Sequence, residues 1–89
     1  MPTYLVERVL PGADLGSVQA LCRAADAACQ RFAAEDKPIR YLRTTFVPGR
    51  SRCSCLFEAP NADLVQAVNE AAQIPYSRIV VALEIGANE

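Results

Sequence analysis

Two segments rich in β-branched and aromatic residues stand back to back in the middle of the chain. They are IRYLRTTFV at 39–47 and RCSCLFEA at 52–59, and only the four residues PGRS separate them. Two extended runs joined by so short a turn-forming segment are typical of a β-hairpin. A hairpin at this position leaves a similar stretch of chain on either side, and this constrains the fold more than any other feature.

The stretch before the hairpin predicts one strand and one helix. TYLVERVL at 3–10 is an extended pattern that stops at Pro11 and Gly12, a strong turn pair. Asp14 is placed to cap a helix, because apolar residues then recur at helical spacing as far as Phe32.

The stretch after the hairpin repeats this arrangement. Asn61 is placed to cap a second helix that Pro75 closes, and SRIVVALEI at 77–85 predicts the last strand. The order is β-α-β-β-α-β, so we expect an α+β ferredoxin-like domain with four antiparallel strands and both helices on one face. The 89 residues suit one such domain over 1–89, with 85–89 as a loose tail.

The open face of such a sheet is usually covered by another element. A second copy of the same chain is the expected cover, because closed two-fold homodimers are the commonest oligomers. We therefore predict a homodimer that forms through the open sheet face.

Charge and hydropathy narrow the range of partners. No apolar run approaches the length of a membrane span and the N-terminal residues lack a secretory pattern, so we expect a cytoplasmic protein without a membrane partner. A net charge of -1 and a third strand without the RNA-recognition signature argue against nucleic acid. Locally, five cations and no acid lie between Lys37 and Arg52, a stretch that either steers an anion or forms a solvated rim.

Cys53 and Cys55 lie one residue apart in the third strand. Alternation places both on the same face as Phe57, which we assign to the helix-covered core. Residues i and i+2 of a strand are about 6.6 Å apart, so these two cysteines should not form a disulfide with each other. Either they are core residues that pack as small hydrophobes, or they bind a transition metal such as nickel, zinc or copper.

Three glutamates interrupt the strands and could line the open face. They are Glu7, Glu58 and Glu84. With Tyr41 and Arg43 from the neighbouring strand, Glu7 and Glu58 would form the catalytic groups if the protein is an enzyme, because clustered carboxylates can take up protons. The alternative is structural, namely glutamate-arginine pairs that set the register of a dimer. The chain has no histidine, P-loop or dinucleotide-binding glycine motif, so no familiar catalytic motif favours the enzyme.

The segments YLVERVLPG, RYLRTTFVP, RCSCLFEAP and AVNEAAQIPYSRIV, in this order, carry a resemblance to a family. The chain resembles a widespread bacterial family of small domains known through a nickel-binding member. The CxCLFEAP element, Asn69 and the segment from Pro75 to Arg78 are its most specific parts. The resemblance implies a ferredoxin-like homodimer, and nickel would have to bind through cysteines or carboxylates because histidine is missing.

These observations favour a small cytoplasmic homodimer that binds a small molecule or a metal ion. A metal-binding protein would use Cys53 and Cys55. Two further hypotheses stay open, a small dimeric enzyme acting on a small-molecule substrate and a non-catalytic interaction module.

Overall fold

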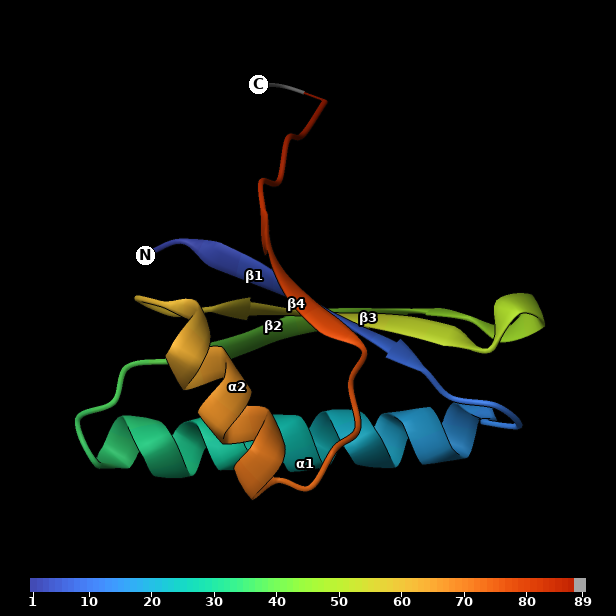
Figure 1. Cartoon of the computed structure of the whole chain (residues 1–89), viewed down its shortest axis with the longest axis horizontal. Coiled ribbons are helices and arrows are strands. Elements are labelled where there is room, and N and C mark those ends of the chain that lie inside the picture. The colour runs from blue at the N-terminus through green and yellow to red at the C-terminus, as the bar shows by residue number, and fades with distance from the viewer. Residues whose placement is uncertain (88–89) are drawn as a thin grey trace.

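A computed structural model describes residues 1–87 of the chain. The helices and strands follow the predicted order (Figure 1). They are β1 (Thr3–Val9), α1 (Leu15–Ala34), β2 (Arg40–Val47), the short 3-10 helix η1 (Pro48–Arg50), β3 (Arg52–Glu58), α2 (Ala62–Ala71) and β4 (Arg78–Ala82).

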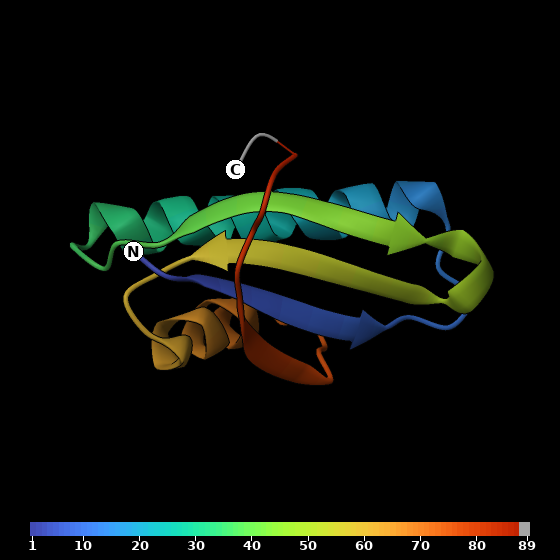
Figure 2. The same cartoon turned by 90° about the horizontal axis from the view of Figure 1, so that it is seen from above.

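The four strands form one sheet in the order β2-β3-β1-β4, and every neighbouring pair is antiparallel. Both helices lie against the same face, which we call the helix face, and the other is the open face (Figure 1). Seen from above, the open face is turned to the viewer and both helices lie behind it (Figure 2). The predicted ferredoxin-like fold is confirmed.

Both helices begin at the predicted caps. The Asp14 carboxylate accepts a hydrogen bond from the backbone N–H of Ser17 at 2.8 Å, and this bond lowers the pKa of Asp14. Asn61 Oδ1 accepts one from the backbone N–H of Leu64 at 2.9 Å. The turn before α1 needs a left-handed residue, and Gly12 adopts φ 75° there.

The core lies between the helix face and the two helices. Val6, Cys55 and Phe57 of the central strands are completely buried, as are Val65 and Val68 of α2. Burial of one such side chain is worth about 1.5 to 3 kcal/mol, so this layer supplies most of the driving force for folding. Cys53 and Cys55 are both part of the core, as alternation predicted.

The last strand is shorter than predicted. It ends at Ala82, which pairs with Thr3, the first residue of β1. Pro2 precedes Thr3 and has no N–H to continue the ladder, so the strand prediction for 83–85 is wrong. The tail from Leu83 to Ala87 instead crosses above the open face and rises away from it (Figures 1 and 2). The predicted loose tail also included 88–89, which lie outside the described residues.

A bulge in β2 changes which side chains share a face. Tyr41 pairs with Phe57, but Arg43 pairs with Leu56, so Leu42 is an extra residue between them. Tyr41 therefore lies on the helix face, where its ring meets that of Phe57 edge-on at 5.7 Å. Arg43 lies on the open face, and the expectation that Tyr41 joins it there is wrong.

Candidate functional site

The three glutamates of the open face do not form a cluster. Glu58 lies opposite Thr3 and Glu7 opposite Ser54, which places them four residues, or about 13 Å, apart along the sheet. Each glutamate has its own arginine. The ion pairs are Glu7 with Arg78, Glu58 with Arg40 at 3.6 Å, and Glu84 with Arg43.

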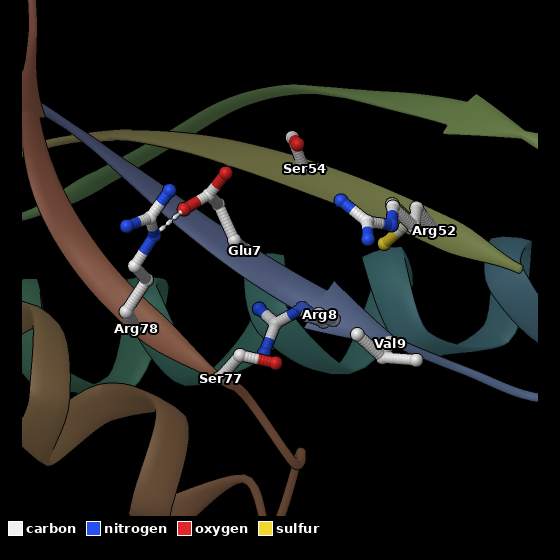
Figure 3. A pocket seen from close by; sticks show the side chains of 8 residues that line it. Glu7, Arg8, Val9, Arg52, Ser54, Ser77 and Arg78 are labelled. Carbon is white, nitrogen blue, oxygen red and sulfur yellow. Dashed lines mark hydrogen bonds and ion pairs between the residues drawn. The ribbon is translucent and has the colours of Figure 1, made fainter. Parts of the chain in front are cut away.

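A pocket of about 250 Å³ lies beside Glu7, where β1, β3 and the start of β4 meet (Figure 3). Its polar lining consists of Glu7, Arg8, Arg52, Ser54, Ser77 and Arg78. The backbone N–H of Ser77 donates to the carbonyl of Glu7 at 2.7 Å, which fixes the entry to β4 against β1. Three arginines and one glutamate therefore line the same small space.

Arg8 is the most unusual of these residues, because its side chain belongs to the core. Only 1% of the residue is exposed. Its guanidinium donates to Asn69 Oδ1 at 2.5 Å, to the carbonyl of Pro75 at 3.1 Å and to Cys55 Sγ at 3.4 Å. None of these acceptors is a carboxylate, so a buried cation is held by neutral partners from β3, α2 and the loop before β4.

Cys55 also belongs to a second chain of hydrogen bonds. Thr44 Oγ1 lies 3.1 Å from Cys55 Sγ and 2.7 Å from the Tyr41 hydroxyl, and Cys22 Sγ donates to the same oxygen at 3.1 Å. The Thr44 hydroxyl thus connects α1, β2 and β3 on the helix face.

Burial raises the pKa of two groups on the helix face. It raises the pKa of Tyr41 to about 12, with a smaller contribution from the contact with Cys22. It also raises the pKa of Cys53 to about 12, and the neighbouring Cys55 adds to that shift. At neutral pH Cys53 is therefore a protonated thiol, whereas a metal ligand or a nucleophile is a thiolate.

Sequence reasoning missed the role of Arg8, although a signal was present. Tyr4, Val6 and Arg8 alternate along β1 with Glu7, so if Glu7 faces the open side, Arg8 must face the core. Asn69 was noted only through the family resemblance. The segments that carry that resemblance supply all three partners of Arg8, namely Cys55, Asn69 and Pro75.

Comparison with known proteins places the chain in a family. A family model described as "Nickel responsive protein SCO4226-like" matches residues 4–81. This range covers all four strands except for the first residue of β1 and the last residue of β4. The chain belongs to the SCO4226-like family. No curated protein sequence matches the chain.

A solved structure of the SCO4226-like family shares the fold. The crystal structure of SCO4226 from Streptomyces coelicolor A3(2) is similar with a TM-score of 0.74 and 20% sequence identity. The match covers 94% of this chain and 99% of that one. At this identity the likeness extends to the fold alone.

The family's description raises the question of whether this chain offers nickel a site. Among residues 1–87, no three His, Cys, Asp or Glu side chains lie together in a group that could hold a metal ion. Cys53 and Cys55 share a face, but the Arg8 cation donates to Cys55 and would repel a second cation. The side chains of residues 1–87 in a single chain therefore do not fit a nickel centre. Metal binding at Cys53 and Cys55 stays a prediction.

Neither helix within the described part of the chain has the length and apolar character needed to cross a membrane.

Proposed function

We propose that this member of the SCO4226-like family works as a cytoplasmic homodimer whose open sheet faces meet and enclose a site for a small ligand. The observation that carries the proposal is the tail that follows β4. Leu83 and Ile85 are 85% and 82% exposed, although they are large aliphatic residues.

The position of the tail favours a second copy as its cover. The tail lies above the open face, where Glu84 is paired with Arg43 of β2 (Figure 2). A second open face placed against the first would bury both aliphatic side chains and would give the tail a sheet to pack on. Exposed apolar surface of this kind is typical of protein interfaces.

The ion pairs of the open face support binding over acid-base catalysis. Glu7 and Glu58, the two carboxylates that an enzyme would use, are each paired with an arginine, so neither is held as a free acid-base group. The four free cysteines, three of them buried, suit the reducing conditions of the cytoplasm.

Light scattering coupled to size-exclusion chromatography tests the dimer. We expect the wild-type chain to elute with the mass of two subunits and a Leu83→Asp/Ile85→Asp variant to elute with the mass of one. Val81→Asp is the matched control, because Val81 is 66% exposed but points to the helix face. A monomeric wild type, or a control that dissociates as readily as the tail variant, would refute the proposal.

Native mass spectrometry tests the metal hypothesis separately. The dimer is titrated with nickel, zinc and copper(I) under reducing conditions. Metal in fixed stoichiometry that is lost in Cys53→Ser and Cys55→Ser would assign these thiols as ligands. A dimer that stays empty would remove metal from the proposed function and leave the small-molecule site.

A further inference from the structure

We propose that the pocket beside Glu7 binds a small anion through a carboxylate or phosphoryl group. The inference deepens the proposed function, since it names the ligand class for the site that the dimer would enclose. It begins with the balance of charge on the open face.

Arginines outnumber carboxylates on that face. Arg78, Arg40 and Arg43 are each paired with a glutamate. Arg52, the remaining arginine, points to the same side as Ser54, and its side chain has no hydrogen-bond or ion-pair partner among residues 1–87. Arg52 lines the pocket, so the unpaired positive charge of the open face lies at this pocket.

A second cation lies behind the pocket. Arg8 also lines this space, although it is only 1% exposed and its guanidinium donates to Asn69, Pro75 and Cys55 on the helix face. Its charge therefore adds to the positive field at the pocket without a direct bond to a ligand. With Arg78 neutralised by Glu7, the charge of Arg52 and the field of Arg8 remain, and a low-dielectric wall strengthens their attraction for an anion.

Hydroxyl groups complete the donor set. Ser54 and Ser77 line opposite sides of the pocket, from β3 and from the loop before β4 (Figure 3). Arginine with serine is a donor set that suits carboxylate and phosphoryl oxygens, because the planar fork of arginine binds two oxygens at once.

The volume limits the ligand. About 250 Å³ is below the range of pockets that enclose drug-sized molecules, so the anion is a small metabolite or an inorganic ion. A cation is disfavoured by the same residues, because the one carboxylate present is already paired with Arg78.

Isothermal titration calorimetry on the full chain tests the site, with inorganic phosphate and succinate as separate probes and glycerol as the neutral control. We expect one of the two anions, or both, to bind, and glycerol not to bind. Phosphate alone would identify a phosphoryl site and succinate alone a carboxylate site.

Two variants should change the affinity for the anion in opposite directions. Arg52→Gln should weaken anion binding about ten-fold, as expected for one charge-assisted hydrogen bond, while Arg50→Gln in the adjacent turn should leave it unchanged. Glu7→Gln removes the competing carboxylate and frees Arg78, so it should strengthen binding about two- to five-fold. A metal site or a catalytic carboxylate at Glu7 would instead lose affinity or activity in this variant.

The outcomes separate this inference from the dimer proposal when light scattering is run on the same samples. A dimer that binds neither anion, or whose affinity is lost equally in Arg50→Gln and Arg52→Gln, overturns the anion site alone. A monomer that binds an anion in an Arg52-dependent way supports the site and overturns the dimer.

Discussion

Arg8 and Arg78 lie on neighbouring strands of the same sheet, yet their side chains differ in burial and in the kind of partner that holds them. Arg8 faces the helices, is 1% exposed and donates to Asn69, Pro75 and Cys55. The Arg78 side chain is 70% exposed and has a carboxylate partner in Glu7. The exposed cation is thus neutralised by an acid, while the buried one is held by dipoles and a thiol.

This difference indicates which face of the sheet stabilises the fold and which face is suited to binding. A buried polar group that loses its partner costs several times more than a surface ion pair, because water cannot replace the partner. On the helix face the structure leaves none of the described buried side-chain nitrogen or oxygen atoms without a hydrogen bond. The helix face therefore holds the fold together, and the open face, with its replaceable ion pairs, is the surface that can change to suit a ligand or a partner.

The largest effect should come from breaking the Arg8 network at Asn69. Asn69→Leu keeps the size of the side chain but leaves a buried guanidinium without the 2.5 Å bond to Oδ1. We expect the free energy of unfolding, measured with urea, to fall by roughly 3 kcal/mol.

A double variant shows whether the unpaired charge is the cause. Arg8→Met together with Asn69→Leu removes the cation as well as its acceptor, and should be more stable than Asn69→Leu alone. Additive losses from the two substitutions would contradict the interpretation that the network compensates a buried charge.

Thr44→Val should have the next largest effect. The substitution preserves shape but removes the hydroxyl that contacts Tyr41, Cys22 and Cys55. We expect a loss of about 1 to 2 kcal/mol, because the half-buried Tyr41 hydroxyl is left without its partner. Thr45→Val, on the opposite face of β2, is the control and should change stability little; equal losses in both would show that the hydroxyl network does not matter.

Most of the fold could be predicted because its signals are local. Asp14 and Asn61 cap their helices through residues only three positions away, and the hairpin follows from the turn between two extended runs. The burial of Cys53 and Cys55 followed from alternation on a strand with no irregularity.

The errors occurred where a distant partner sets the local structure. β4 ends because β1 begins at Thr3, which the residues of β4 do not reveal. The bulge at Leu42 reverses the face of every residue after it, so it separated Tyr41 from Arg43 in the candidate site. The pairing of Glu7 with Arg78 and of Glu58 with Arg40 likewise depends on register across the sheet, which the sequence leaves open.

Buried thiols on the helix face should have a smaller effect on the free energy of unfolding, which should appear at alkaline pH. Burial raises the pKa of Cys53 from its ordinary 9.0 to about 12, and that of Cys29 likewise to about 12. The unfolded chain therefore loses these protons first, and the free energy of unfolding should fall as the pH rises from about 9 towards about 12. Below pH 9 the contribution of these thiols is constant.

Cys53→Ala checks this assignment by urea unfolding at a series of pH values. The variant should show a shallower alkaline decline than the wild type, although Cys29 keeps part of it. Cys22→Ala, which removes a half-buried thiol, is the control. An unchanged slope in Cys53→Ala would mean that Cys53 ionises equally well in the folded chain.

The smallest effect should come from an ion pair of the open face, and this prediction also probes what covers that face. Arg40 and Glu58 are 3.6 Å apart, with side chains 69% and 28% exposed in the single chain. Arg40→Gln should therefore change the free energy of unfolding by no more than about 0.5 kcal/mol, and less at high salt. If the loss exceeds about 2 kcal/mol and does not depend on salt, the pair is desolvated, as expected when a second subunit lies on it. Measuring the variant over a range of protein concentrations distinguishes the two cases, because only a pair buried between two copies of the chain would lose its effect on dilution.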